Sequence, residues 1–183
     1  MRIEDVKRHF EVEVRWKGFP LHPEIPAQGL PLKDLFRGRD VDIPAIQARL
    51  KRTAAELNLP WVGLEMTYNT RLAQEAGKWA EEKGKGEEYH QAVFHAYFVE
   101  GKNIGDPVVL AALAENLGLP SDEALEMLQS RKFRPAVDED WALSRDCFIT
   151  AVPTFMIDQD RLVGAQPYSL LEQFMRKHAV PEK

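Results

Sequence analysis

Cysteine is almost absent from this sequence: among its 183 residues the only one is Cys147. A single cysteine excludes an intramolecular disulfide, and the chain contains no Cys-x-x-Cys motif of a dithiol redox site. Metal-binding patterns are lacking as well. His90 and His95 are the two histidines nearest to each other, and their spacing does not place both on one helix face. We therefore expect no metal ion and no other cofactor.

The sequence also lacks long apolar runs and blocks of basic residues. Its net charge is -5 and its pI about 5.6, which argues against a surface for nucleic acid. No apolar run approaches the roughly 18 residues that a membrane-spanning helix needs. The first residues are charged and have no apolar core of the kind that a signal peptide requires. We expect a cytoplasmic protein with no nucleic-acid or membrane partner.

Hydrophobic residues make up 44% of the chain, which is enough for a globular core. A short helix is predicted over residues 1–9, and the period-two alternation of Val12–Trp16 predicts a strand. The proline-rich and glycine-rich residues from Pro20 to Gly38 predict a long loop. Helix starts are then predicted from capping residues and prolines. They lie at Asp42, Asn69, Asp106, Ser121, Pro135 and Pro167, with a further helix after Gly86.

The helix that begins at Asp42 repeats Ile46, Leu50, Ala54 and Leu57 on one face. Between Asn69 and Gly101, five aromatic residues stand at helical spacing, and we interpret them as core residues. They are Trp79, Tyr89, Phe94, Tyr97 and Phe98. In the last helix, Leu170 and three further apolar residues are predicted to face the core. They are Leu171, Phe174 and Met175.

The segment from Thr150 to Asp158 is the most distinctive in the chain. Pro153 stands at the entry of an apolar run that predicts a strand, one of the few strand positions where proline is tolerated. Residues 161–164 predict a second strand. This order of elements indicates an α/β protein in which a helical block interrupts a small sheet. We expect residues 1–20 and 149–183 to form the core domain and residues 40–148 the helical insertion.

Four stretches resemble the DsbA-like branch of the thioredoxin superfamily, in particular the bacterial group often labelled polyketide-biosynthesis-associated dithiol-disulfide isomerases. They occur in the order of that family and span nearly the whole chain. They are VEVRWKGFPLHP at 12–23, YFVEGKNIGD at 97–106, AVPTF at 151–155 and GAQP at 164–167. The resemblance implies a thioredoxin-like sheet with a helical insertion, and a family activity of thiol-disulfide oxidoreduction.

The resemblance also implies what this chain does not contain. In the family, a first strand and the Cys-x-x-Cys precede a segment like Arg2–Phe10, and this sequence starts after that place. We therefore expect that Met1 is not the natural start. The rival hypothesis is a degenerate protein whose gap is closed by strand rearrangement or by a partner chain. Either way we expect no dithiol activity from these residues, and no catalytic residue is assigned.

The candidate site is the proline loop. The resemblance implies a cis peptide before Pro153 and substrate binding by Val152, Pro153 and Thr154. We interpret Cys147 as a small buried residue at a helix end. Asn69 is interpreted as a helix cap, although it stands in a stretch that in relatives faces the active-site groove. Expected partners are a protein or small-thiol substrate, and a homodimer is left open.

Three functional hypotheses follow. The first is a thiol-disulfide oxidoreductase of the DsbA-like family, without dithiol activity in the 183 residues. The second is a redox-inactive thioredoxin-like module that binds peptides or dimerises. The third is an enzyme like 2-hydroxychromene-2-carboxylate isomerase or kappa-class glutathione transferase, which share the fold. Those enzymes use a serine or cysteine at the start of the motif that is missing here.

Overall fold

The computed structural model describes residues 2–183, so the prediction for Met1 falls outside the described residues. The chain forms two compact units, residues 1–21 with 139–183 and residues 22–138. The first unit contains α1 (Arg2–His9) and the last three elements of the chain. No helix among residues 2–183 combines the length and the apolar character needed to cross a bilayer.

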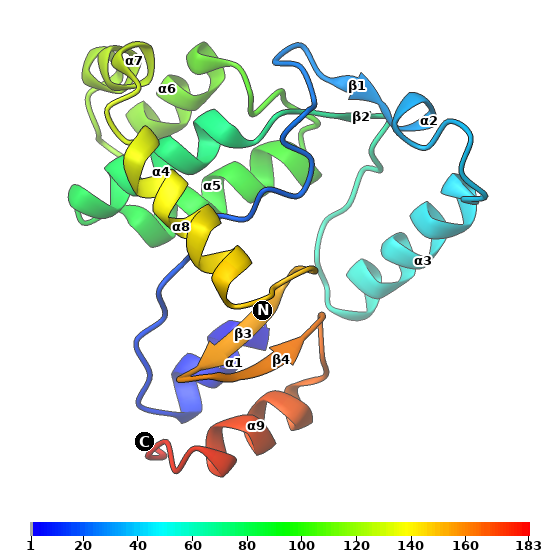
Figure 1. Cartoon of the computed structure of the whole chain (residues 1–183), viewed down its shortest axis with the longest axis vertical. Helices are drawn as coiled ribbons and strands as arrows, with labels where there is room; N and C mark the ends of the chain where they lie inside the picture. Colours follow the sequence, from blue (N-terminus) through cyan, green and yellow to red (C-terminus); the bar gives the residue numbers. More distant parts are fainter. Residues whose placement is uncertain (1) are drawn as a thin grey trace. The chain divides into compact units, whose positions relative to one another are not determined.

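The first unit is built on a β-hairpin. β3 (Thr154–Ile157) pairs antiparallel with β4 (Asp160–Val163), and α9 (Tyr168–Lys177) follows (Figure 1). Asp158 in the connecting turn has a φ of 52°, a conformation that short hairpin loops require. One face of the hairpin packs on α1 and α9. Its core consists of Val6, Phe10, Leu171, Phe174 and Met175, with Phe155, Ile157 and Leu162 of the hairpin against it.

The predicted strand at Val12–Trp16 is wrong, because these residues form no strand in the structure. The side chains nevertheless alternate in burial: Val12, Val14 and Trp16 are half-buried, whereas Glu13 and Arg15 between them are exposed. A strand needs a neighbour with which to exchange backbone hydrogen bonds. Within residues 2–183 no strand pairs with this segment, so it remains extended but irregular.

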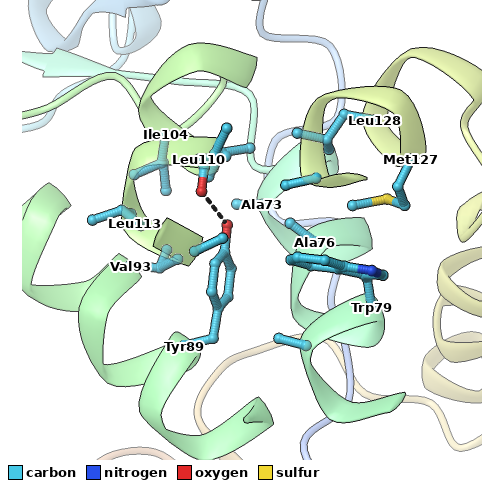
Figure 2. Packing of buried hydrophobic residues seen from close by; sticks show 14 of the residues in the cluster. Ala73, Ala76, Trp79, Tyr89, Val93, Ile104, Leu110, Leu113, Met127 and Leu128 are labelled. Carbon is cyan, nitrogen blue, oxygen red and sulfur yellow. Dashed lines mark hydrogen bonds between the residues drawn. The ribbon is translucent and has the colours of Figure 1, made fainter. Parts of the chain in front are cut away.

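The second unit is mainly helical. It contains α2 (Leu32–Leu35) and α3 (Ile43–Glu56), then α4 (Arg71–Glu82), α5 (Gly86–Phe98), α6 (Pro107–Asn116) and α7 (Ser121–Ser130). Trp79 of α4 and Tyr89 of α5 are each 1% exposed in its core. Figure 2 shows Trp79 beside Met127, and the hydroxyl of Tyr89 donating to the carbonyl of Leu110 at 3.1 Å.

Parts of the predicted pattern need correction. The region from Pro20 to Gly38 is not loop throughout, since it contains α2 and β1 (Leu30–Pro31), which pairs with β2 (Met66–Thr67). Phe94 is 42% exposed and therefore is not a core residue. Leu170, predicted to face the core, is exposed as well. Phe94 follows the buried Val93, and Leu170 precedes the buried Leu171. Successive helical residues point about 100° apart, so both side chains turn away from the buried face of their helix.

Capping explains why the helices begin where they do. The side chain of Asp42 accepts from the amide of Ala45, and that of Asp106 accepts from the amide of Val108. Proline follows each start at a first-turn position that needs no amide hydrogen. The last helix before the hairpin is α8 (Arg134–Asp146), and the division between the two units falls within it.

Candidate functional site

The loop between α8 and β3 begins with an unusual helix end. The amide of Phe148 donates to the carbonyl of Arg145 at 2.9 Å, and the amide of Ile149 donates to that of Ser144 at 2.8 Å. These two bonds are those of a Schellman motif, whose left-handed residue is usually glycine. Here it is Phe148, with a φ of 51° and a side chain that is 82% exposed. A large apolar ring therefore projects from the start of the loop.

The loop ends at the predicted substrate-binding residues. The peptide bond between Val152 and Pro153 is cis, and both side chains are exposed. The carbonyl of Pro153 accepts from the amide of Gly164 at 2.7 Å. Because Gly164 directly follows β4, this bond fixes the loop to the hairpin. The hydroxyl of Thr154 donates to the carbonyl of Ala151 at 2.7 Å. The three predicted residues are thus consecutive, accessible and held by local bonds.

β3 has one open edge. The register pairs Phe155 with Leu162, and the bond between Gly164 and Pro153 belongs to the same ladder. Antiparallel ladders alternate bonded and non-bonded pairs, so the backbone groups of Phe155 and Ile157 face β4. Those of Thr154 and Met156 must face the opposite edge. Within residues 2–183, no strand pairs with β3 on that side.

The two edges of the hairpin differ in charge. β4 carries Asp160 and Arg161, and charged side chains commonly protect a solvent-facing edge strand. A hydrogen bond from Lys177 lowers the pKa of the Asp160 carboxyl, which keeps this carboxyl charged within an ion pair to that lysine. β3 has no charged residue between Thr154 and Ile157. Its open edge therefore has the composition of a strand that normally has neighbours on both sides.

The outer face of the hairpin borders a cavity of about 410 Å³. The register places Thr154, Arg161 and Val163 on this face, opposite the face that packs on α1 and α9. The loop completes the lining, which consists of Phe148, Ile149, Thr150, Thr154, Arg161 and Val163. Of these, the predicted site contained only Thr154. Period-two alternation in the sequence could have predicted that Met156 lies on the same face as Thr154. Arg161 and Val163 could not be predicted in this way, because their place on that face depends on how β4 pairs with β3.

Cys147 lies just after the last residue of α8 and is half-buried. The guanidinium of Arg161 donates to its backbone carbonyl, not to its sulfur. A helix C-terminus carries partial negative charge, which disfavours a thiolate. The position therefore fits the structural role predicted for Cys147, although the side chain is less buried than expected.

The N-cap of α4 is Thr70 and not the predicted Asn69, and the side chain of Thr70 makes no capping bond. Asn69 stands one residue earlier, where its side-chain oxygen accepts from the amide of Arg71 at 2.9 Å. Its amide group also donates to the carbonyls of Ile25, at 2.7 Å, and Pro23, at 3.2 Å. His90 and His95 contact different glutamates. Among the described residues, no three metal-binding side chains form a group that could hold an ion.

With the sheet, the proline loop and the helical unit described, comparison with known families places the chain in the DSBA-like thioredoxin domain family. The match spans residues 1–176. The chain therefore belongs to this family, and the predicted thioredoxin-like fold with its DsbA-like resemblance is confirmed. Its sequence is 33% identical over 174 residues to the uncharacterized protein YwbO of Bacillus subtilis, covering 93% of this chain and 84% of that protein.

Solved structures agree in fold. The probable DsbA oxidoreductase SCO1869 from Streptomyces coelicolor superposes with a TM-score of 0.87 and 23% identity, covering 100% of this chain and 85% of that one. A 2-hydroxychromene-2-carboxylate isomerase superposes with a TM-score of 0.67 and 19% identity, over 85% of this chain and 78% of its own. The cytosolic disulfide reductase DsbM from Pseudomonas aeruginosa superposes with a TM-score of 0.54 and 20% identity, covering 73% of this chain and 77% of that one.

Proposed function

We propose that this chain carries the substrate-binding part of a DsbA-like thiol-disulfide oxidoreductase site, and that its 183 residues have no dithiol activity by themselves. The observation that carries the proposal is the combination of family membership with a single cysteine. Val152, Pro153 and Thr154 are proposed to bind an extended segment of a protein or small-thiol substrate. A reducing, cytoplasmic environment is part of the proposal, since it fits a chain without disulfides.

The chemistry explains why one cysteine is not enough. In dithiol exchange a thiolate attacks a substrate disulfide, forms a mixed disulfide and releases one substrate thiolate. A second enzyme thiol must then attack the mixed disulfide, which releases the other substrate thiol and leaves the enzyme oxidised. Cys147 has no second cysteine to complete this step. Its place after the C-terminal end of α8 also disfavours the first step.

The open edge of β3 supports substrate binding. An extended segment that adds to a sheet edge gains main-chain hydrogen bonds, while its side chains enter neighbouring pockets. Thr154 and Met156 offer such main-chain groups, and the cavity around Phe148 and Arg161 adjoins the same face of the hairpin. We expect a bound segment to protect the amides of Thr154 and Met156 from hydrogen exchange, and those of Phe155 and Ile157 to change little.

Insulin reduction by dithiothreitol tests the catalytic part of the proposal. The 183-residue chain should accelerate the reaction no more than its Cys147→Ser variant does. Acceleration that disappears in Cys147→Ser would overturn the proposal, because it would assign redox activity to the lone thiol. The binding part is tested by amide exchange in the presence of an extended cysteine-containing peptide. Equal protection along all of β3 would count against edge binding.

The open edge also favours the dimerising form of the second hypothesis, in which the module pairs with its own copy. Two β3 strands related by a two-fold axis through Met156 would exchange hydrogen bonds antiparallel. Met156→Lys would place like charges opposite each other and should give a monomer in light scattering. Val163→Lys, on the same face but in β4, is the matched control and should leave any dimer intact. A wild-type monomer at all concentrations would eliminate the dimerising form of this hypothesis and leave its peptide-binding form.

The third hypothesis, an isomerase or glutathione transferase, draws support only from the isomerase structure. An identity of 19% shows a shared fold and carries no further weight for its activity. We therefore propose the substrate-binding function above in preference to it.

A further inference from the structure

α3 is an amphipathic helix that buries none of its residues. It has 14 residues, and Ile46 and Leu50 of its apolar face stay 37% and 40% exposed. In Figure 1, α3 (cyan) stands to the side of the α4–α7 bundle. The amide of Gln47 anchors it by donating to the carbonyl of Leu64 at 2.6 Å. Helices of this length are marginal on their own, so an apolar face left in water is a liability unless something covers it.

Further apolar side chains are exposed just beyond the helix. Leu57, Leu59 and Val62 are exposed on the segment that follows α3. This segment is fixed to the end of α5, because the amide of Val62 donates to the carbonyl of Phe98 at 3.4 Å, and the ring of Trp61 stacks on that of Phe98 at 5.7 Å. We call the five exposed residues the α3 platform. They are Ile46, Leu50, Leu57, Leu59 and Val62.

Two cations flank the apolar stripe of α3, one on each side. Arg49 and Lys51 precede and follow Leu50, and successive residues of an α-helix are about 100° apart, so one cation borders each side of the apolar stripe. Both side chains are exposed. Within residues 2–183, neither makes an ion pair, whereas most cations of the helical unit do. The chain as a whole has a net charge of -5, so these cations are not a general property of its surface.

We propose that the α3 platform binds an acidic, apolar segment of a polypeptide substrate. The apolar side chains of such a segment would cover Leu50 and its neighbours, and its carboxylates would pair with Arg49 and Lys51. The inference rests on the proposed function, because it names the class of substrate that the site would receive. The proposal adds a binding surface in the helical unit to which the family resemblance gives no role.

Charge decides between this occupant and two others. A second copy docked by the same helix, parallel or antiparallel, would bring Arg49 and Lys51 against the same cations of its partner, which is repulsive. An anionic membrane is disfavoured by the negative net charge of the chain and by the small number of cations, since polybasic lipid-binding segments carry about 4 to 8. An acidic polypeptide segment can place its carboxylates beside Arg49 and Lys51, so it is the occupant that the charges favour.

Fluorescence anisotropy with labelled synthetic peptides tests the proposal. Three peptides of equal length are compared with the 183-residue chain: one alternating leucine with glutamate, one with lysine in place of glutamate, and one with serine in place of leucine. We expect binding of the first alone, weakening as salt is raised. The double variant Arg49→Glu/Lys51→Glu should weaken it by about tenfold or more. Leu50→Ser should weaken it as well.

Arg145→Glu is the matched control, because Arg145 is also an exposed helical arginine without an ion pair among residues 2–183. It should leave the anisotropy curve unchanged. Circular dichroism checks that each variant keeps its helix content. Equal binding of the lysine peptide, or equal binding by the double variant, would overturn the proposal. So would binding to phosphatidylserine vesicles without peptide binding, or a dimer that Leu50→Ser abolishes.

The peptides contain no cysteine, and their binding is read without any redox step. If the chain binds the glutamate peptide, but the cysteine-containing peptide does not protect the amides of Thr154 and Met156 from exchange, the inference about the α3 platform stands and the proposed function is contradicted. The reverse result would retain the proposed function and overturn this inference. The two failures are therefore distinguishable.

Discussion

The guanidinium of Arg131 donates two hydrogen bonds to the buried carboxylate of Glu75, from Nε to Oε2 at 2.8 Å and from Nη2 to Oε1 at 2.7 Å. Arg71, one helical turn before Glu75 in α4, adds a third bond at 2.8 Å. Glu75 is 0% exposed, so the two arginines compensate a charge that would otherwise be very costly to bury. The bonds between Glu75 and Arg131 join α4 to the C-terminal end of α7, because Arg131 is the residue directly after that helix.

Glu75→Gln should lower the free energy of unfolding by about 2 kcal/mol, because it preserves shape but removes the carboxylate acceptor of Arg131 and leaves Arg71 with Asp138 as its carboxylate acceptor. Urea denaturation measures the change. Glu172→Gln is the matched control, since Glu172 pairs with Arg176 on the exposed surface of α9. Its loss should be about 0.5 kcal/mol or less. Equal losses in the two variants would show that the buried pair contributes nothing special.

The same carboxylate predicts a pH dependence. Burial disfavours its charged form, but the hydrogen bonds from Arg131 and Arg71 outweigh burial and hold the pKa of Glu75 below its ordinary value. A native pKa below the unfolded one means that the stabilisation is complete above the unfolded pKa, about 4.3, and is lost as pH falls through the native pKa. The stability difference between wild type and Glu75→Gln should therefore shrink on acidification below about pH 4. A constant difference would contradict the assignment.

The sequence predicts the helices well because their signals are local. Asp42 and Asp106 each cap their own helix, and the proline after each suits the first turn. Strands depend on distant partners. β1 and β2 contain two residues each and pair across a connection that holds α2 and α3, which no local pattern reveals. Val12–Trp16 shows the converse: its side chains alternate as in a strand, but no strand among residues 2–183 pairs with it.

The site was predictable only where a motif carries it. Val152, Pro153 and Thr154 are consecutive in the AVPTF stretch, so a family resemblance finds them together. Arg161 joins the loop through the hairpin register and a bond to the carbonyl of Cys147, and neither is visible in the sequence. Arg131 is 56 residues from Glu75, so only the fold brings them together.

Two asparagines hold the loop around residues 23–27 by the same geometry. The amide of Asn69 donates to the carbonyls of Pro23 and Ile25, and that of Asn103 donates to the carbonyl of Ala27 at 3.1 Å. Asn69→Asp keeps the oxygen that accepts from the amide of Arg71 at the start of α4, but it sets a carboxylate against two carbonyls. We expect a loss of about 1 to 3 kcal/mol.

Hydrogen exchange distinguishes the two roles of Asn69. In Asn69→Asp, exchange should accelerate in residues 23–27, while the first turn of α4 stays protected. Asn58→Asp is the matched control, because Asn58 is exposed and its side chain makes no hydrogen bond among the described residues. It should change stability by about 0.5 kcal/mol at most. Acceleration confined to α4 would mean that the bond from Arg71 to Asn69, not the loop contact, dominates.

Phe148 and Arg131 give opposite predictions for the same substitution. Both adopt positive φ after a helix, at 51° and 55°, where glycine avoids the strain of a β-carbon. Phe148→Gly removes a side chain that is mostly exposed and should raise the free energy of unfolding by about 0.5 to 1 kcal/mol. Arg131→Gly relieves the same strain but breaks both bonds to Glu75, so it should lower stability by about 2 kcal/mol. Thermal and urea denaturation of both variants measure the two changes, and shifts of the same sign would refute the comparison.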